Sequence, residues 1–241
     1  MIDLHCHFLP GIDDGARTLA ESLALARAAV AAGITTAVMT PHVYPGRYYN
    51  TRQTITKLCT AFQRVLRHQQ VALDIRAGGE VRVCADIMRM IEVHEIPFLG
   101  VADGYRVMLL EFPHSHLPLG SDTLVSWLLA RRIRPLIAHP ERNKEVMRNA
   151  DKIEPFVKMG CLLQITGGSL VGHFGKTAQH CARALVQRGW ASVVATDAHN
   201  LAHRPPCLDL AYAALVGLGG EACARSLTIE TPARLIAGSL Q

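Results

Sequence analysis

Residues 34–42 have the sequence ITTAVMTPH, and this stretch decides the fold class. It is apolar and rich in β-branched residues until a proline ends it, a pattern typical of a buried strand. Toward the N-terminus, Thr18 and Glu21 have the spacing of a capping box, which predicts the start of a helix that Gly33 ends. Before that helix, Ile2–His7 has the pattern of a short strand. The first 42 residues therefore predict a strand–helix–strand unit.

The same alternation continues along the chain. The expected strand regions are residues 2–7, 34–40, 71–83, 105–112, 135–139, 161–166 and 192–196. Helical patterns separate them, including a largely helical region expected over 145–160. Continuous apolar strands that alternate with helices predict an α/β protein with a parallel sheet, either open or closed into a barrel. No linker or charge block interrupts residues 1–241, so we expect a single domain.

Composition excludes several classes of protein. Hydrophobic residues make up 49% of the 241 positions, and 25 basic against 20 acidic residues give a formal charge of +5, so an ordered chain is expected. No apolar run has the length of a transmembrane helix and no signal peptide is recognised, so we expect no membrane insertion. The dispersed basic residues argue against a nucleic-acid partner. Seven cysteines without a C-x-x-C pair indicate reduced thiols in a cytoplasmic protein.

Residue types that bind metals stand at the carboxyl ends of six of the seven strands. They are His5 and His7, His42, Glu80, Glu111, His139, and Asp197 with His199. In a barrel all strand ends meet on one face, where such proteins build their sites, whereas an open sheet spreads them along a line. The pattern therefore predicts a distorted (β/α)7 TIM-like barrel with a metal site on its carboxyl face.

The spacing of these residues supports a shared site. His5 and His7 are two residues apart on a strand, so both side chains point to one side and can reach one ion. Asp197 and His199 repeat that spacing at the last strand. Nitrogen and oxygen donors without a thiolate suit manganese, iron or zinc. Cys6 faces the opposite side of the strand and is predicted to be a core residue.

Charge indicates more than one ion. Four carboxylates would share the pocket: Asp14, Glu80, Glu111 and Asp197. About three divalent ions would leave a net charge near +2, which suits a phosphate dianion. Such a cluster can supply hydroxide near neutral pH for in-line displacement at phosphorus. A cysteine mechanism is excluded, because no cysteine begins a C-x5-R loop, and Gly167-Gly168 does not continue into a P-loop.

Short motifs identify a family that this sequence resembles. They are MIDLHCHFLPGIDDGA at residues 1–16, TPH at 40–42, GGE at 78–80, LEFP at 110–113, AHPER at 138–142 and ATDAHN at 195–200. Together they resemble the PHP (polymerase and histidinol phosphatase) superfamily, and most closely its CpsB/YwqE-type protein-tyrosine phosphatases of bacterial capsule and exopolysaccharide biosynthesis. The resemblance covers nearly the whole chain and implies the PHP fold, a distorted (β/α)7 barrel.

The resemblance also implies three divalent ions, usually manganese, and a place for each ligand. One ion would be held by His5, His7, Glu80 and Asp197. A second ion, which Glu80 bridges to the first, would also be bound by Glu111 and His139. The third ion would be held by Asp14, His42 and His199.

The implied activity is hydrolysis of phosphotyrosine in proteins, and the implied partner is a bacterial tyrosine autokinase that controls polysaccharide export. A hydroxide bridging two ions would attack phosphorus in line, with Glu80 and Asp197 as catalytic ligands. Arg142 and Arg204 match the family's arginines that hold the substrate phosphate, a task that suits a planar guanidinium. Tyr48, shortly after His42, is expected to line the mouth of the site and to contact an aromatic substrate.

Other interpretations stay open at this point. The same site could act on a small phosphate ester such as histidinol phosphate, or on a phosphodiester. The protein could also be a non-catalytic, metal-containing regulator that binds the kinase tail. His114 and His116 follow Pro113 in a loop and are expected to be exposed, and the sequence assigns no role to His173 or His203. The helices after residue 207 could pack on the barrel or on another subunit, so an oligomer is also open.

Overall fold

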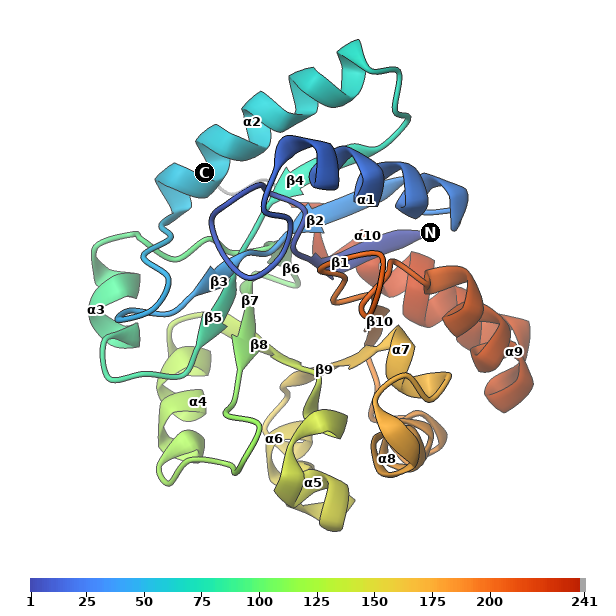
Figure 1. Cartoon of the computed structure of the whole chain (residues 1–241). Helices are drawn as coiled ribbons and strands as arrows, with labels where there is room; N and C mark the ends of the chain where they lie inside the picture. The colour runs from blue at the N-terminus through green and yellow to red at the C-terminus, as the bar shows by residue number, and fades with distance from the viewer. Residues whose placement is uncertain (239–241) are drawn as a thin grey trace.

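The computed structural model describes residues 1–238 and has a mixed α/β architecture (Figure 1). The strands are β1 (Ile2–Cys6), β2 (Thr36–Met39), β3 (His42–Val43), β4 (Asp74–Ala77), β5 (Glu80–Arg82), β6 (Gly100–Ala102), β7 (Tyr105–Glu111), β8 (Ile133–Ala138), β9 (Leu162–Thr166) and β10 (Val193–Ala195). The α-helices are α1 (Leu19–Ala31), α2 (Arg52–His68), α3 (Ile87–Glu92), α4 (Ser121–Ala130), α5 (Lys144–Arg148), α6 (Glu154–Lys158), α7 (Gly167–Leu170), α8 (Gly175–Gln187), α9 (Leu208–Arg225) and α10 (Thr231–Leu235). Short 3-10 segments cover Pro140–Arg142 and Ala150–Ile153, and a π-helical turn covers Ser226–Glu230. The predicted alternation of strands and helices is confirmed.

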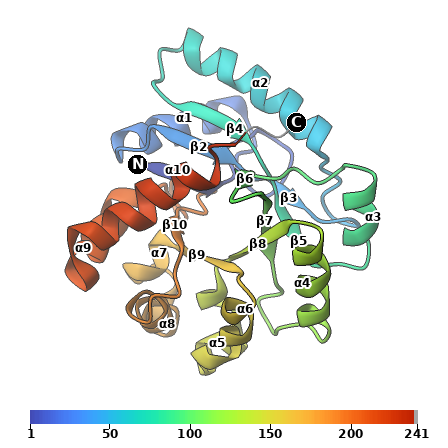
Figure 2. The same cartoon turned by 180° about the vertical axis from the view of Figure 1, so that it is seen from behind.

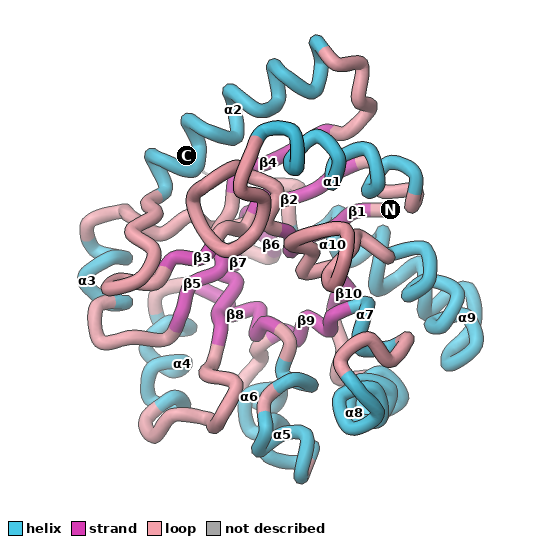
Figure 3. The backbone as a smooth tube through the Cα atoms, in the orientation of Figure 1, coloured by secondary structure: helices cyan, strands magenta, loops and turns pink. Residues whose placement is uncertain are grey.

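The strands form two sheets. One has the order β1-β2-β4, and the other has the order β10-β9-β8-β7-β5-β3, with β6 antiparallel to β7. All the other pairings are parallel. Figure 3 shows the strands at the centre with the helices around them, and Figure 2 shows the same arrangement from behind. The predicted parallel α/β fold is therefore confirmed.

The two sheets meet where the chain bends between short strands. β2 continues into β3 through Thr40 and Pro41, and β4 continues into β5 through two glycines. A Cβ on Gly78 would lie 2.7 Å from the Val38 side chain, so this close approach requires glycine. The bends shift the partners of each strand, and the hydrogen-bonded ladder is interrupted at this point.

On the other side, β1 meets the chain just beyond β10. Cys6 and Ala198 form an isolated parallel bridge, and the backbone N–H of His7 donates to Ala198 O at 2.9 Å. Asp197 N likewise donates to His5 O at 2.7 Å. These bonds join the two sheet edges locally. The ladders within residues 1–238 do not form one closed ring, so the finer prediction of a closed barrel is not confirmed.

An irregularity in β1 orients the first site residues. Asp3 pairs with Ala37 but Cys6 pairs with Met39, so β1 contains one extra residue, as in a β-bulge. Leu4 therefore packs in the apolar cluster enclosed by both sheets and α10, whereas Cys6 packs in the larger core beneath the helices. The prediction that Cys6 is a core thiol is confirmed, and all seven cysteines are free.

Two segments differ from the expectation. The helical region expected over 145–160 is divided, because Asn149 is extended and its side chain accepts a hydrogen bond from Asp151 N at 3.0 Å, which starts a new segment. The sequence did not predict β6, which pairs with β7 across the Asp103–Gly104 turn. Within residues 1–238 there is no helix that combines the length and the apolar character needed to cross a bilayer.

Candidate metal centre

The structure brings all nine predicted ligands together at the carboxyl ends of the strands. Their donor atoms form overlapping groups of three or four within 4.8 Å. The members are His5, His7, Asp14, His42, Glu80, Glu111, His139, Asp197 and His199, with His114 as a tenth. Most are buried, and Asp14 and His114 are exposed. Residues separated by up to 194 positions thus share one site, because the parallel strands end on the same side.

One group has the dimensions of a metal site. His5 Nε2 lies 3.2 Å from His7 Nε2 and 3.3 Å from Asp197 Oδ1. Glu80 Oε2 lies 3.4 Å from His5 Nε2 and 3.5 Å from His7 Nε2. Four donors about 2.1 Å from a common centre in a tetrahedron lie roughly 3.4 Å apart. The distances from the two histidines to each carboxylate therefore suit ligands of a single ion.

Glu80 connects this group to the others. Its Oε1 lies 2.8 Å from His139 Nε2, and its Oε2 lies 2.8 Å from His42 Nδ1. Glu111 joins a group with His139 and another with His42 and Glu80. A carboxylate with both oxygens directed at different histidines is placed to bridge two ions.

The remaining group lies nearer the surface. His42 Nε2 is 3.2 Å from Asp14 Oδ1, and His199 Nε2 is 3.6 Å from the same oxygen. His7 belongs to this group as well as to the first one. The three groups are thus contiguous.

Neighbouring polar groups fix the orientation of the histidines. His7 Nδ1 lies 2.7 Å from Asp13 Oδ2, which also accepts from the backbone N–H of His42 at 3.1 Å. His5 Nδ1 lies 2.9 Å from Gln164 Oε1. Such partners set the tautomer and the ring orientation, so that Nε2 of each histidine faces the centre of the cluster. Asp13 therefore orients the His7 ring and holds the backbone of His42.

Electrostatics in the cluster favour replacement of protons by cations. Burial would lower the pKa of His5, but the Glu80 and Asp197 carboxylates outweigh it and raise the pKa to about 9. Burial would also lower the pKa of His42, but the Glu80 and Asp14 carboxylates outweigh this effect and raise the pKa to about 11. Although burial acts the other way, His5 and the nearby cations hold the pKa of Asp197 well below its usual range. The Asp197 carboxylate is therefore charged, and it stabilises positive charge beside it.

Two histidine ligands are neutral at neutral pH, and Glu111 is about half ionised. Burial and the Arg142 guanidinium lower the pKa of His139 to about 3, and burial and His7 lower the pKa of His199 to about 4. Burial and Glu80 raise the pKa of Glu111 to about 7, although Arg82 opposes this. Neutral imidazoles have the lone pair that a metal ion requires.

Three buried ligand atoms of the cluster have no hydrogen-bond partner, and this tests whether the residues fit a cation. They are Glu80 Oε2, Asp197 Oδ1 and His199 Nε2. A buried polar atom without a partner is costly, and ions in the cluster would satisfy all three. The donor set contains only imidazole nitrogens and carboxylate oxygens, which manganese, iron and zinc all accept. The residues therefore fit divalent cations.

Two predicted arginines converge on the cluster. Arg142 Nη1 and Arg204 Nη2 both donate to Asp197 Oδ2. The Arg142 guanidinium also lies 4.4 Å from the centre of the Phe174 ring. Both arginines line a pocket of about 250 Å³ that opens over the ligands. They are in place to meet an anion that enters this pocket.

Tyr48 lies where the sequence placed it, at the pocket wall. Its ring stacks on the imidazole of His42, with centroids 5.4 Å apart and planes 15° apart. Tyr49 is exposed and lies outside this pocket.

Two site residues escaped the sequence reasoning. Arg82 Nη1 donates to Glu111 Oε1 at 2.7 Å and lines the pocket. His114 is exposed as expected, but it stacks on His139 at 5.4 Å and lies 3.2 Å from Arg142. Arg82 lies two residues after Glu80 on β5, and that period-2 spacing was the available signal. His114 had no such signal, because a loop places it.

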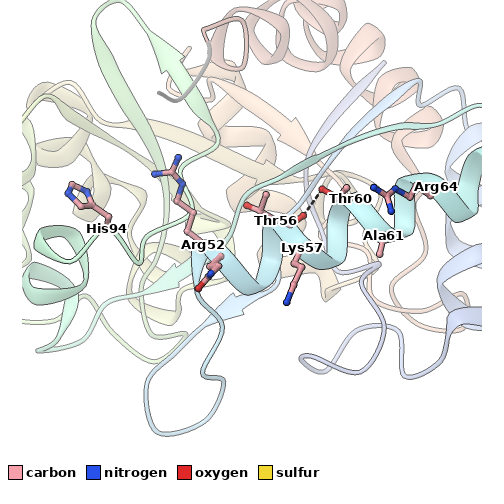
Figure 4. A pocket seen from close by; sticks show the side chains of 8 residues that line it. Arg52, Thr56, Lys57, Thr60, Ala61, Arg64 and His94 are labelled. Carbon is pink, nitrogen blue, oxygen red and sulfur yellow. Dashed lines mark hydrogen bonds between the residues drawn. The ribbon is translucent and has the colours of Figure 1, made fainter.

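The other undecided histidines lie outside the cluster. His116, His173 and His203 are exposed and belong to none of the ligand groups within residues 1–238. A larger groove of about 720 Å³ runs along α2 and contains no group of metal ligands (Figure 4). We therefore place the chemistry in the smaller pocket over the cluster.

Fold and site together define an α/β protein with a candidate multi-metal centre at the carboxyl ends of parallel strands. Residues 1–237 match the family described as capsular polysaccharide synthesis, CpsB/CapC. The chain belongs to the CpsB/CapC family.

Characterised relatives carry tyrosine-phosphatase names. The tyrosine-protein phosphatase YwqE of Bacillus subtilis strain 168 is 36% identical over 204 residues, which cover 85% of this chain and 79% of YwqE. The tyrosine-protein phosphatase CpsB of Streptococcus pneumoniae is 29% identical over 245 residues, 100% of both chains. A crystal structure from work on these two proteins, described as unique metal-dependent tyrosine phosphatases, matches with a TM-score of 0.91 and 33% identity. It covers 100% of this chain and 96% of the matched chain.

Proposed function

We propose that this protein is a metal-dependent protein-tyrosine phosphatase. The observation that carries the proposal is the convergence of Arg142 and Arg204 on Asp197, a ligand at the centre of the cluster. Cations and two guanidinium groups around one pocket make a site for a phosphate dianion. The relatives YwqE and CpsB carry tyrosine-phosphatase names, which supports phosphotyrosine as the substrate.

The centre would hold three divalent ions, with manganese preferred and iron or zinc also accepted. His5, His7, Glu80 and Asp197 would hold the first ion, Glu80, Glu111 and His139 the second, and Asp14, His42 and His199 the third. When bound, the ions would supply Lewis-acid stabilisation of the phosphate and activation of the attacking water. The overlap of the donor groups supports this assignment.

The chain's own residues would position the substrate. Once Asp197 is engaged with cations, the guanidinium groups of Arg142 and Arg204 can donate to the phosphate oxygens and stabilise charge as it develops. Tyr48 would pack against the substrate ring. Burial and Arg142 lower the pKa of His114 to about 4, so this histidine is neutral and is not an acid at neutral pH. Tyrosinate, with a pKa near ~10, leaves without a strong acid.

We also propose that the two sheets act as one distorted seven-unit barrel and that residues 1–241 form one domain. The bridge between Cys6 and Ala198 and the direct continuation of β2 into β3 support this reading. Seven free thiols support a reducing, cytoplasmic location. We propose a tyrosine autokinase as the physiological partner, and the CpsB/CapC family description supports capsular polysaccharide synthesis as the process in which both act.

Phosphate release from a tyrosine-phosphorylated peptide and from histidinol phosphate tests the function. Metal-stripped protein is titrated with manganese, with and without thiol alkylation. Release from the peptide that requires manganese and survives alkylation supports the proposal. Release only from histidinol phosphate would keep the site and replace the substrate, and ion binding without any release would indicate a regulatory binding protein.

A further inference from the structure

A long segment beside the site carries positive charge only. Residues 22–73 contain none of the 20 acidic residues of the chain but six of its 25 lysines and arginines. The segment includes β3, the turn after it and the whole of α2. Its net charge exceeds that of the entire chain, which is +5. Such a concentration of one sign creates a surface that attracts acidic partners.

Arg47 begins this surface at the mouth of the catalytic pocket. It is exposed, and its guanidinium lies 5.1 Å from the centre of the Tyr48 ring, which in turn stacks on His42. Within residues 1–238 no carboxylate lies within 4.0 Å of it, in contrast to Arg82, Arg142 and Arg204 in the same pocket. Arg47 is therefore free to pair with a group outside the chain.

The turn that carries Arg47 is fixed to the metal centre. Tyr44 and Tyr48 exchange two backbone hydrogen bonds, at 3.0 and 2.7 Å. The side chain of Asn50 donates to His42 O and to Ile12 O, both at 2.9 Å. Because His42 is a candidate ligand, these bonds hold the Arg47 turn in a set position relative to the candidate metal centre.

Beyond the turn, the groove of about 720 Å³ follows the exposed side of α2. Figure 4 shows Arg52, Lys57 and Arg64 projecting along this helix, with His94 at its start. None of the three long side chains has an ion-pair partner within residues 1–238. The groove is a row of unpaired positive charges.

A third depression joins the pocket to this groove. It shares Tyr48 with the pocket, and it adjoins the α2 groove at Thr51 and Arg52. Its two carboxylates, Asp86 and Glu95, lie 3.8 and 3.3 Å from Arg89, which is an ion-pair partner of both but offsets only one of the two charges. The path from the metal centre to the end of α2 is therefore continuous, and the single remaining negative charge of this depression is outnumbered by the unpaired basic side chains on either side of it.

We propose that this path binds an acidic stretch of the protein substrate next to the phosphotyrosine. The inference rests on the proposed function and names the substrate class: tyrosines flanked by aspartate or glutamate. Arg47 contacts the residues adjoining the phosphotyrosine, and α2 holds the segment further along. The 12 steps from Arg52 to Arg64 span about 18 Å of helix, which about six extended residues would cover. A small phosphate ester would fill only the pocket and would make no contact with α2.

Kinetics on matched peptides test the proposal. Two short peptides carry one phosphotyrosine flanked by two glutamates or by two lysines on each side, and two long peptides extend these flanks by ten residues. We expect wild type to prefer the acidic peptides. Arg47→Glu should raise KM for both acidic peptides roughly tenfold, because an attractive pair becomes a repulsive one. The Lys57→Glu/Arg64→Glu double variant should raise KM roughly tenfold for the long acidic peptide only.

Lys152→Glu is the matched control, since Lys152 is exposed and lies in the 3-10 segment between α5 and α6, away from α2. It should change no KM. Equal KM values for acidic and basic flanks, or equal effects of the control and the double variant, would overturn the inference. The inference would also be overturned if the double variant lost binding to anionic vesicles but kept the wild-type KM for every peptide. That result would assign the basic groove along α2 to a membrane surface.

Binding of a labelled, unphosphorylated acidic peptide separates this inference from the activity. Anisotropy should show binding that weakens with salt and is lost in the double variant, whether or not any peptide is hydrolysed. Binding without hydrolysis would refute the phosphatase and keep the docking surface. Hydrolysis with no difference between flanks would keep the phosphatase and refute the docking surface.

Discussion

The hydrogen bonds of Asp13 predict a measurable contribution to metal affinity. Asp13 accepts from three groups: His7 Nδ1 at 2.7 Å, Gly15 N at 2.9 Å and His42 N at 3.1 Å. Asp13→Asn keeps the shape but turns one acceptor oxygen into an NH₂ donor. In either orientation of the amide, at least one of these three donors then faces another donor.

The size of the effect follows from the role of such partners. Groups that orient a ligating histidine typically change metal affinity or activity by about 10–100-fold, or about 1.4–2.8 kcal/mol. Because Asp13 orients His7 and also holds the backbone of His42, we expect a loss within this range for manganese. Asp13→Asn should leave the fold intact, since residue 13 lies in a loop and asparagine has nearly the same shape as aspartate.

The assay is competition for manganese with a fluorescent chelator, with thermal unfolding to confirm folding. Asp122→Asn is the control, because Asp122 is exposed on α4 and contacts no candidate ligand. The control should bind manganese as wild type does. A folded Asp13→Asn protein with unchanged affinity would refute the argument that Asp13 positions the ligands.

Four further predictions follow from the same site. The pKa values of His5 and His42 are about 9 and about 11, so both side chains are cationic at pH 7.5 before ions bind. Binding of manganese should therefore release about two protons per molecule. Calorimetry in buffers of different ionisation enthalpy would measure this release. The pKa of His5 in the folded protein exceeds its unfolded value of 6.5, so its contribution to stability is complete below pH 6.5 and is lost as the pH rises through 9. The melting temperature of chelator-treated protein should therefore fall over that interval. A constant melting temperature would contradict the pKa shift. A Cβ on Gly15 would lie 2.2 Å from His7 O, so Gly15→Ala should lower the melting temperature by about 2–10 °C, whereas Gly217→Ala on α9, with no atom within 4 Å, should keep or raise it. Arg142→Lys keeps the charge but loses the planar guanidinium with its paired donors, so kcat/KM on a phosphotyrosine peptide should fall about 10–100-fold while the manganese content stays unchanged. A fall in manganese content instead would make Arg142 a structural partner of Asp197.

Much of the fold and site could be predicted because the relevant patterns are local. Apolar β-branched runs such as residues 34–40 specify strands, and Thr18 with Gly33 bounds the first helix; Thr18 accepts from Glu21 N, and Gly33 has a φ of 79°. Parallel strands end on one side of a sheet, so the positions of histidines and carboxylates were enough to collect eight candidate ligands. The ninth, Asp14, lies in a loop, and its role as a ligand was implied by the family resemblance.

The tertiary structure decided what depends on distant contacts. His114 reaches His139 because Asn143 Nδ2 donates to Pro113 O at 2.7 Å and His116 O at 2.9 Å, which folds the loop back over the cluster. Arg142 and Arg204 are 62 residues apart, and only the folded chain brings both to one carboxylate.

By itself, the sequence determined the alternation of elements, the donor types and their place at the strand ends, because periodicity and capping act over a few residues. Only the tertiary structure decided how the sheets meet, that Arg142 and Arg204 converge on Asp197, and that the basic groove along α2 is connected to the mouth of the pocket. Those features depend on loop paths and side-chain contacts between distant segments, for which a single sequence carries no local signal.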